Sequence, residues 1–410
     1  MKILLLCNKS PFPPREGGPI AMHAIVSGLL QAGHQVKVLA INTNKYFTRP
    51  EDIPQDYRRK TRIEFVYIDL SLKPADALFN MLVGQSYHVA RFYSKEFEHK
   101  LFEILHEEQF DIIQLETMFM GPYLPLIRKY SNAQVILRAH NIEHLIWERI
   151  AKACRNPLKR FYLKHLAFTL GKYENKLIGE VDGIATITAI DAAYFAKKKT
   201  GTPVITIPFG IDTSTTTLPD YTKEQFPSLF HIGSMNWIPN QESIRWFIVK
   251  VWPILHQHHH ELKLYLAGRD MPDWLLNLTQ SGIVIIGEVD DARAFMRDKS
   301  VMIVPLLSGS GIRIKIIEGM MEGKAIVSTS IGAEGIEAEN GRHLLLANTP
   351  EEFIAAIERC ICDRTFCHNI GTQAREMLLT TYDNRLIINK LTGFYTELIN
   401  TTISKAPSSS

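Results

Sequence analysis

The sequence predicts an α/β protein with two domains, each a parallel sheet covered by helices, that face one another across a cleft. The chain has 410 residues, which is enough for two or three domains. Short apolar segments with strand character alternate along it with longer helical patterns, and this alternation is typical of parallel sheets. The alternation occurs in two successive series, and each series predicts one Rossmann-like domain.

The first series predicts an N-terminal domain over residues 1–207. It opens with a buried strand at residues 2–7, a loop rich in proline and glycine, and a helix over residues 19–32 that Gly33 ends. Further apolar runs predict strands at residues 35–41, 63–68, 112–115, 134–137, 183–188 and 204–207. A threonine-rich run that ends at Pro219 then predicts a linker.

The second series predicts a C-terminal domain over residues 208–385. Its strands are expected at residues 229–232, 262–266, 283–286, 301–304, 325–328 and 344–346, and its helices include residues 240–255, 272–281 and 315–322. A last helix at residues 386–403 is expected to pack back on the N-terminal domain, and residues 404–410 are expected to be disordered. Ligands should lie in the cleft, at the carboxyl ends of the strands.

The composition excludes several classes of protein. Apolar residues make up 46% of the chain and charged residues 22%, which excludes disorder, collagen and coiled coils for its bulk. A net charge of +3 disfavours a dedicated nucleic-acid binder. We find no signal peptide, no apolar run of transmembrane length and no disulfide framework among the five cysteines, so a cytoplasmic protein is expected.

Two loops of the predicted N-terminal domain hold candidate site residues. Gly17 and Gly18 lie between the first strand and the first helix, where backbone N–H groups and the helix dipole could hold an anion. Turn chemistry alone explains two glycines there equally well. His140 follows a strand at its carboxyl end, beside a second histidine, an arginine and a glutamate. Catalysis or phosphate contact and a purely structural role are both open for it.

The densest signal lies in residues 305–324. A strand is followed by a loop of small residues and by a helix that is expected to begin near Ile312, with Arg313 and Lys315 in its first turn. Cations are unfavourable at a helix N-terminus. They make sense if a diphosphate binds there and supplies the compensating charge. Glu318, one turn further on, would reach a hydroxyl-bearing group on that diphosphate. The N–H groups expected to bind the diphosphate belong to Gly309, Ser310, Gly311 and Ile312.

Other nucleotide and metal sites are disfavoured. Ile314 stands where a dinucleotide fingerprint would continue with a third glycine after Gly309 and Gly311, and no G-x-x-x-x-G-K-[ST] loop occurs. A nicotinamide dehydrogenase and a P-loop NTPase are therefore not expected. No Asp-x-Asp supports a divalent ion, and the group around Cys360 and His368 lacks zinc-knuckle spacing, so no metal site is predicted.

With these residues identified, the chain resembles a retaining glycosyltransferase of the GT-B fold, in the GT4 family of group 1 glycosyl transferases. The likeness covers nearly the whole chain and is strongest over residues 230–336. Four segments resemble, in order, the family's interdomain turn, the first strand and loop of its donor domain, its second donor-domain strand and the segment that faces the nucleotide base: residues 208–212, 230–240, 264–269 and 283–289.

The resemblance implies a donor site in the C-terminal domain. The family's Glu-x7-Glu signature falls on Ser310 and Glu318, so Glu318 is expected to bind the ribose, and Ser310 replaces the glutamate that contacts the transferred sugar. The basic pair that commonly follows the first donor-domain strand is absent, and Arg313 and Lys315 would replace it. The other residues expected to contact the donor are Gly233, Ser234, Asn236, Gly287 and Val289.

The implied reaction is transfer of a hexose-type sugar from a UDP- or GDP-sugar to a hydroxyl of a growing glycan or lipid-linked acceptor, as in polysaccharide biosynthesis. The C-terminal domain would hold the donor and the N-terminal domain the acceptor, with no metal or other cofactor. Arg313 and Lys315 would stabilise the charge on the departing diphosphate. The resemblance implies front-face attack with retention of configuration, with His140 helping to position the oxocarbenium-like sugar.

Two other functions fit the same fold. A GT-B epimerase acting on a nucleotide sugar would use the same donor pocket, and sugar transfer to an acceptor, rather than isomerisation of the donor, would distinguish the two. A catalytically silent two-domain ligand-binding protein is the non-enzyme alternative. Slow hydrolysis of the donor in the absence of acceptor would dismiss it.

A basic and apolar stretch suggests contact with an anionic membrane. Residues 1–207 carry 28 Lys and Arg against 20 Asp and Glu, whereas residues 208–410 carry 18 against 23. Seven of these cations lie at helical spacing among apolar residues: Lys152, Arg155, Lys159, Arg160, Lys164, Lys172 and Lys176. Two interpretations are open, a core helix with a solvated basic side or peripheral docking on anionic lipid at the inner face of the membrane, to reach a lipid-linked acceptor.

Overall fold

The chain forms two units in the computed structural model, which describes residues 1–14, 17–71, 86–198, 200–213, 220–309 and 312–405. Unit 1 comprises Met1–Ile211 and Asn384–Ser410, and unit 2 comprises Asp212–Asp383. The sequence suggested boundaries after residues 207 and 385. Unit 1 extends further because Phe209 and Ile211 are buried and the carbonyl of Ile211 accepts a hydrogen bond from the Asn384 N–H at 2.9 Å.

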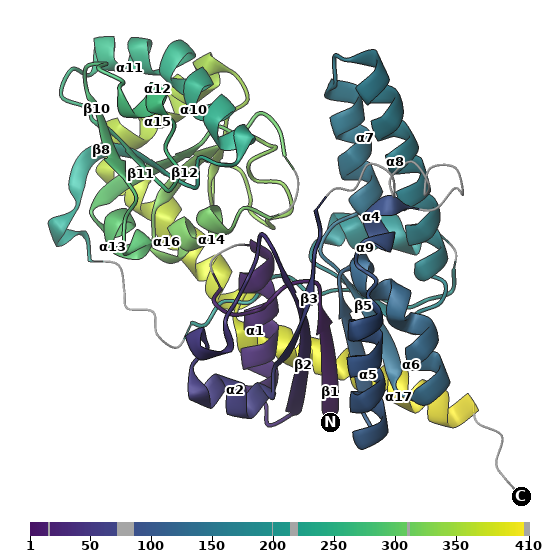
Figure 1. The fold of residues 1–410 in the computed structure, drawn as a ribbon. Coiled ribbons are helices and arrows are strands. Elements are labelled where there is room, and N and C mark those ends of the chain that lie inside the picture. The colour runs from purple at the N-terminus through teal and green to yellow at the C-terminus, as the bar shows by residue number, and fades with distance from the viewer. Residues whose placement is uncertain (15–16, 72–85, 199, 214–219, 310–311, 406–410) are drawn as a thin grey trace, which may run out of the picture. The chain divides into compact units, whose positions relative to one another are not determined.

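Unit 1 contains a seven-stranded parallel sheet in the order β3-β2-β1-β4-β5-β6-β7 (Figure 1). Its strands are β1 (Lys2–Cys7), β2 (Gln35–Thr43), β3 (Glu64–Ile68), β4 (Ile112–Glu116), β5 (Gln134–Ala139), β6 (Gly183–Thr186) and β7 (Val204–Thr206). The direction in which successive strands are added reverses between β1 and β4. In doubly wound sheets, ligands bind at the carboxyl ends of the two strands that flank such a reversal.

Helices cover both faces of this sheet. Residues on β1 alternate between two cores, with Leu4 and Leu6 in one and Ile3 and Leu5 in the other. The helices of unit 1 are α1 (Gly17–Gln31), η1 (Pro50–Asp52), α2 (Gln55–Thr61), α4 (Tyr87–Ala90), α5 (Lys95–Glu107), η2 (Met118–Tyr123), α6 (Leu124–Tyr130), α7 (Glu143–Ala153), α8 (Pro157–Leu177), α9 (Ala189–Ala196) and α17 (Asn384–Lys405).

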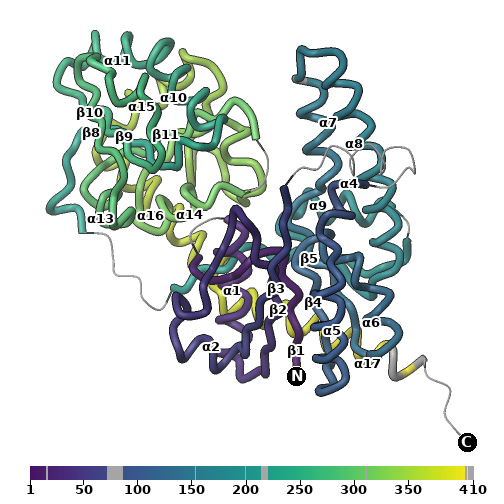
Figure 2. Tube along the Cα trace, in the orientation of Figure 1, coloured from purple at the N-terminus to yellow at the C-terminus, as the bar shows by residue number. Residues whose placement is uncertain are grey.

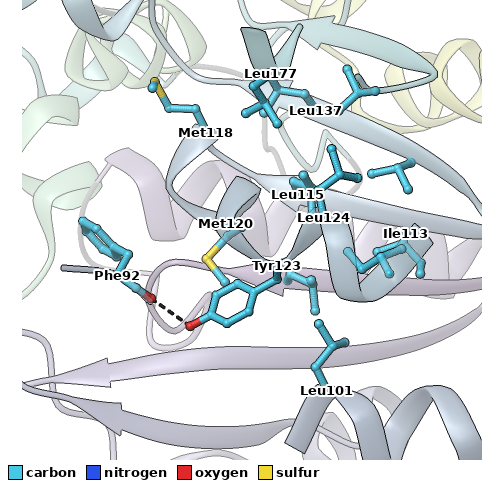
Figure 3. Packing of buried hydrophobic residues seen from close by; sticks show 14 of the residues in the cluster. Phe92, Leu101, Ile113, Leu115, Met118, Met120, Tyr123, Leu124, Leu137 and Leu177 are labelled. Atoms are coloured by element: carbon cyan, nitrogen blue, oxygen red, sulfur yellow. Dashed lines mark hydrogen bonds between the residues drawn. The ribbon is translucent and has the colours of Figure 1, made fainter. Parts of the chain in front are cut away.

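One core cluster fixes the segment that follows β4 (Figure 3). Tyr123 of η2 is fully buried, and its ring packs against Phe97 with 4.5 Å between centroids. Its hydroxyl donates a hydrogen bond of 2.8 Å to the carbonyl of Phe92. A buried tyrosine hydroxyl requires such a partner. The bond and the packing therefore hold η2 in place and, with it, the carboxyl end of β4.

The C-terminal helix α17 covers the opposite face of the same sheet, as the yellow segment in Figures 1 and 2 shows. Ile388 and Tyr395 share a core cluster with Ile3 and Leu5 of β1. Gly28 of α1 permits a close approach, since a Cβ there would lie 2.4 Å from Ile388 Cγ1. The last helix therefore belongs to unit 1, although unit 2 precedes it in the sequence.

Unit 2 repeats the same topology with six parallel strands in the order β10-β9-β8-β11-β12-β13. These are β8 (Gln225–Ile232), β9 (Leu264–Ala267), β10 (Ile283–Gly287), β11 (Lys299–Val304), β12 (Ala325–Ser328) and β13 (Leu345–Leu346). Its helices are η3 (Tyr221–Lys223), α10 (Ile238–Lys250), α11 (Trp252–His258), α12 (Asp273–Leu276), α13 (Ala292–Arg297), α14 (Ile314–Met321), α15 (Pro350–Cys362) and α16 (Arg364–Thr381). The predicted class of two Rossmann-like domains is confirmed.

Several helix boundaries differ from the prediction. The helix expected at 240–255 is two helices, because Pro253 has no N–H and begins a new helix at Trp252. The helix expected at 272–281 ends at Leu276, where the Asn277 side chain donates a hydrogen bond to the Asp273 carbonyl at 2.8 Å. Most of the predicted linker, residues 214–219, and all but two residues of the predicted disordered tail lie outside the described residues.

The basic stretch 152–176 is also divided. Helix α7 ends at Ala153, and α8 begins at Pro157 with Asn156 as its N-cap. The Asn156 side chain accepts a hydrogen bond from the Lys159 N–H at 3.1 Å. Lys152, Arg155 and Lys159 therefore do not share one helical face. Among the described helices, none is long and apolar enough to cross a membrane.

Candidate functional site

Lys315 lies at the reversal point of the unit 2 sheet, where β8 and β11 end. Its ammonium donates a hydrogen bond to Asn240 Oδ1 at 2.9 Å and lies 3.3 Å from His231 Nε2. His231 Nδ1 is 2.9 Å from the carbonyl of Ile303, to which it donates, so Nε2 is the lone-pair nitrogen that accepts from Lys315. Neutral partners on α10 and β8 thus hold the ammonium in a fixed place.

The ammonium of Lys315 has no carboxylate partner among the described residues. Burial, and then the neighbouring charge of Arg313, lower its pKa to about 7. Burial and the adjacent lysine also hold the pKa of His231 well below its usual range. A desolvated cation without a counter-charge is unfavourable. An anion bound next to Lys315 would supply the missing counter-charge, so the site favours an anionic ligand.

Arg313 adds a second cation immediately before α14. The helix begins at Ile314, not near Ile312 as predicted, because Arg313 adopts an extended N-cap conformation with φ −88° and ψ 94°. Its guanidinium lies over the ring of Trp237, 5.2 Å from the centroid. Burial lowers its pKa to about 10, and Glu334 opposes this shift. Arg313 is thus a buried N-cap residue, whereas Lys315 is in the first turn as predicted.

The loop before Arg313 requires at least one glycine. Gly309 has φ +129°, and a Cβ there would lie 2.7 Å from Arg313 Nη2 and 3.0 Å from the Trp237 ring. Ser310 and Gly311, both predicted to contact the donor, lie outside the described residues. The backbone of Gly309 thus lies directly against the guanidinium of Arg313.

Glu318 lies three residues after Lys315, on the same face of α14. It is half-buried, and no described residue donates a hydrogen bond to its carboxylate. Burial raises its pKa, an effect that Arg293 opposes and Glu322 reinforces. A carboxylate with open acceptor positions, one turn from a lone ammonium, is arranged to receive hydroxyl groups of a ligand whose anionic part binds Lys315.

Glycines line the carboxyl edge of the sheet next to Lys315. A Cβ on Gly233 would lie 2.7 Å from Lys315 Nζ, and a Cβ on Gly268 would lie 1.9 Å from the Gly233 carbonyl oxygen. The Gly268 N–H in turn donates to the carbonyl of Gly287 at 2.7 Å, and Gly287 has φ +81°. Gly233 and Gly268 thus let the Lys315 ammonium and the neighbouring loop lie directly against the backbone of this edge.

The remaining residues predicted to contact the donor lie at the same edge. Asn236 Nδ2 and Ser234 Oγ both donate to Asp270 Oδ2, at 3.0 Å and 3.4 Å. These bonds join the loop after β8 to the loop after β9, where Asp270 has φ +56°. Val289 is half-buried, two residues beyond the end of β10. The donor contacts of these three residues stay predictions.

The structure adds three residues to this site that the sequence interpretation missed, namely His231, Trp237 and Asn240. His231 is fully buried next to the last residue of strand β8, and a buried histidine at a strand end is the signal that could have identified one of them. Asn240 is also buried, and its amide holds both Lys315 and the carbonyl of Ser234, the latter at 2.8 Å. His231 and Asn240 set the position of Lys315, and Trp237 packs against Arg313.

A second polar group lies at the carboxyl ends of β4 and β5 in unit 1, next to the reversal point. His140, just beyond β5, has its Nε2 2.8 Å from Oε2 of Glu116, the last residue of β4. Burial raises the pKa of Glu116, but the hydrogen bond from His140 and the charge of Arg138 outweigh it and leave the pKa lowered. An ionised carboxylate can only accept, so the imidazole carries a proton on Nε2 and presents Nδ1 away from Glu116.

A buried hydrogen-bond chain orients Glu116. Gln114 Nε2 donates to Glu116 Oε1 at 2.6 Å, and the hydroxyl of Tyr395 on α17 donates to Gln114 Oε1. Arg138 is fully buried with its Nε 3.9 Å from Glu116 Oε2, and burial lowers its pKa. Sequence reasoning singled out His140 but missed Glu116, although a carboxylate that ends a buried strand is an available signal.

The other polar and glycine residues considered in unit 1 lie at the starts of α1 and α7. Gly17 begins α1, and a Cβ on Gly18 would lie 2.9 Å from Lys9 Cε, so a lysine accompanies this helix N-terminus. Burial and Glu174 raise the pKa of Glu143 to about 7, while Asn141 and Lys9 oppose the shift. The second histidine of the His140 loop is structural, since His144 is buried and bonded to Glu174 and Tyr194.

Metal-binding clusters are not found in the described part of the chain, where no three His, Cys, Asp or Glu side chains are grouped to hold an ion. Cys360 of α15 and the nearby Cys367 of α16 are both buried.

Known proteins resemble this chain in part of its sequence and in its fold. Residues 226–363 match the family model described as "Glycosyl transferases group 1". A curated relative, an "Uncharacterized 44.6 kDa protein in cps region" of Klebsiella pneumoniae, is 21% identical over 404 residues, which cover 95% of this chain and 98% of the relative.

Solved structures resemble the whole chain. Sucrose-phosphate synthase from Thermosynechococcus elongatus has a TM-score of 0.69 at 15% identity and covers 98% of this chain and 100% of its own. Anabaena HepE in complex with UDP has a TM-score of 0.67 at 14% identity, with coverage of 97% and 100%. A variant of S. aureus TarM in complex with fondaparinux, α-GlcNAc-glycerol and UDP has a TM-score of 0.66 at 10% identity, with coverage of 96% and 100%. This chain thus has the GT-B fold of glycosyltransferase structures, and its residues 226–363 match the family model of group 1 glycosyl transferases.

Proposed function

We propose that the protein is a glycosyltransferase that moves a sugar from a nucleoside diphosphate donor to a hydroxyl of a glycan or lipid-linked acceptor. The observation that carries this proposal is the ammonium of Lys315, held by two neutral side chains beside Arg313 at the start of α14. A diphosphate matches the two cations, and Glu318 would accept the ribose hydroxyls. Structural neighbours of the same fold are complexes with UDP and with UDP-glucose, which supports a UDP-sugar donor.

The proposed reaction retains configuration, as in the GT4 family. The bond between the anomeric carbon and the β-phosphate oxygen breaks while the acceptor oxygen attacks from the same face, and the acceptor proton passes to the departing phosphate. Arg313 and Lys315 stabilise the charge that develops on the diphosphate, so that the reaction needs no metal ion. Unit 1 binds the acceptor, and His140 contributes to stabilising the oxocarbenium-like sugar, with Glu116 as its buried counter-charge.

The first experiment is a thermal-shift screen of nucleotide sugars, followed by product analysis with the best donor. A ligand at a hundred times its Kd stabilises the fold by about 2.7 kcal/mol, which gives a clear rise in Tm. We expect UDP-sugars to give this rise and slow release of UDP to occur without acceptor. Isomerised donor sugar without any transfer product would contradict the proposal and favour an epimerase, and a bound but unconsumed donor would favour a binding protein.

Donor binding should depend on pH through Lys315. The pKa of its ammonium is lowered to about 7 in the free protein, and a bound diphosphate would raise it again by favouring the charged form. Above pH 7 the free protein must therefore take up a proton to bind UDP. Affinity should fall as pH rises from 7 to 9, by up to about tenfold per pH unit. Titration calorimetry in buffers of different ionisation enthalpy should show this proton uptake.

Lys315→Arg is the matched control for this pH dependence. A guanidinium stays charged across the range, so the variant should bind UDP without proton uptake and with little change in affinity between pH 7 and 9. If the unmodified protein binds UDP with the same affinity from pH 7 to pH 9, Lys315 does not take up a proton on binding.

A further inference from the structure

Helices α7 and α8 of unit 1 form a hairpin that carries a solvent-exposed surface. The two helices lie side by side and extend beyond the sheet from the carboxyl end of β5 (Figure 1). The chain leaves β5, passes His140 and enters α7 at Glu143. The base of the hairpin is therefore at the same sheet edge as the imidazole of the candidate site.

Three large apolar side chains of α8 are left in solvent. Leu158 is 82% exposed, Phe161 72% and Phe168 71%. Their spacings of three and seven residues put them on one face of the helix. The opposite face, which includes Leu163 and Leu170, is buried in unit 1. A cluster of exposed aromatic and aliphatic side chains on one face marks an interaction surface.

Cations surround these apolar side chains. Lys164 and Lys172 are exposed and lie one turn before and one turn after Phe168. The chain from residue 149 to residue 173 contains seven Lys and Arg and no Asp or Glu. The surface is thus both strongly positive and apolar, and the first property calls for an anionic partner while the second calls for an apolar interior.

We propose that this α8 surface, defined by Leu158, Phe161, Lys164, Phe168 and Lys172, docks the protein on an anionic lipid bilayer. A nucleic-acid duplex would neutralise the lysines but leave Leu158 and the phenyl rings in water, and stacking of single-stranded bases would still leave Leu158 exposed. A bilayer accommodates both, with the cations at the phosphates and the rings at the acyl boundary. The inference rests on the proposed function and narrows it, because it places a lipid-linked acceptor near His140.

The test is sedimentation of the full-length protein with vesicles. Vesicles of phosphatidylcholine with phosphatidylglycerol should bind it at low salt and release it at high salt, and vesicles of phosphatidylcholine alone should bind it much more weakly. The double variant Lys164→Glu and Lys172→Glu should bind anionic vesicles at least about tenfold more weakly. Phe161→Ser with Phe168→Ser should cause a loss of about tenfold or more at unchanged charge.

Matched controls lie on exposed positions of unit 2. Lys250→Glu with Lys263→Glu makes the same change in charge, and Val249→Ser with Ile254→Ser removes exposed apolar groups. Both control pairs should bind vesicles within about twofold of the unmodified protein if charge and apolar area act only at the α8 surface. All variants should keep the rise in Tm with UDP, because none of them touches the donor site.

Three results would overturn the inference. The first is no binding to anionic vesicles at low salt. The second is that the variant Phe161→Ser with Phe168→Ser binds anionic vesicles as well as its control, Val249→Ser with Ile254→Ser. Charge attraction alone would then explain the binding. The third is an oligomer in sedimentation velocity that the phenylalanine pair converts to monomer without any effect of vesicles, which would assign the surface to a second copy of the chain. Absence of a Tm rise with UDP in the unmodified protein would instead contradict the proposed function, whatever the vesicles show.

Discussion

Lys315→Ala is expected to weaken UDP binding by about 1.5 to 3 kcal/mol, or roughly ten- to a hundredfold, near pH 6.5. The reason is the fixed position of this ammonium, which Asn240 and His231 hold without any described carboxylate to neutralise it. Titration calorimetry with UDP measures the loss directly. The fold should be unaffected or slightly stabilised, because removal of a desolvated cation without a counter-charge removes an unfavourable group.

The control for this variant is Lys250→Ala, which removes an exposed lysine at the end of α10 in the same unit. It changes the net charge equally and should leave UDP affinity unchanged within the error of the measurement. If Lys315→Ala and Lys250→Ala bind UDP equally well, the anion site at the start of α14 is wrongly assigned.

Glu318→Gln probes the other end of the same ligand. Its carboxylate accepts no hydrogen bond from a described residue, so we expect it to bind the ribose hydroxyls and its loss to cost UDP binding about 1.5 to 3 kcal/mol. Inorganic pyrophosphate has no ribose. Its affinity should therefore fall in Lys315→Ala and stay unchanged in Glu318→Gln. Equal effects of Glu318→Gln on both ligands would assign the carboxylate to the diphosphate end of the site.

The local part of this architecture could be predicted from the sequence. Alternating apolar segments predict both parallel sheets, since strand and helix periods are set by residues close together in the chain. Arg313, Lys315 and Glu318 could be identified in the same way, because loop, helix start and charges lie within one short segment. Helix boundaries were missed where a single residue interrupts the apolar pattern. Pro253 begins a new helix, and Asn277 ends one.

The non-local part could not be predicted, because it depends on which strands are neighbours. His231 meets Lys315 across 84 residues of sequence, and Glu116 meets His140 across 24. Both contacts arise from the strand order around the reversal point, which brings the ends of separate strands to one edge. Tyr395 reaches Gln114 across 281 residues, since α17 returns to unit 1 after the whole of unit 2. No local pattern marks such a pair.

His140→Ala is expected to lower kcat by about a hundred- to a thousandfold while leaving the Kd of UDP unchanged. The donor contacts that we propose are in unit 2, whereas the imidazole is in unit 1 and would act on the sugar only as charge develops on it. Steady-state kinetics with donor and acceptor, together with calorimetry for UDP, separate the two quantities. Equal losses in UDP affinity and turnover would make His140 a contact to the bound donor rather than to the transition state.

Glu116→Gln tests whether the effect depends on the geometry seen here. The amide keeps the shape and can still accept from the imidazole N–H, but it removes the negative charge that the buried Arg138 and His140 face. We expect a smaller loss of kcat than for His140→Ala, because the imidazole stays in place but loses the negative charge that faces it. His140→Ala combined with Glu116→Gln should be no slower than His140→Ala alone, because Glu116 acts through the imidazole. A double variant with additive losses would mean that Glu116 contributes independently, and His140 would then need another positioning partner.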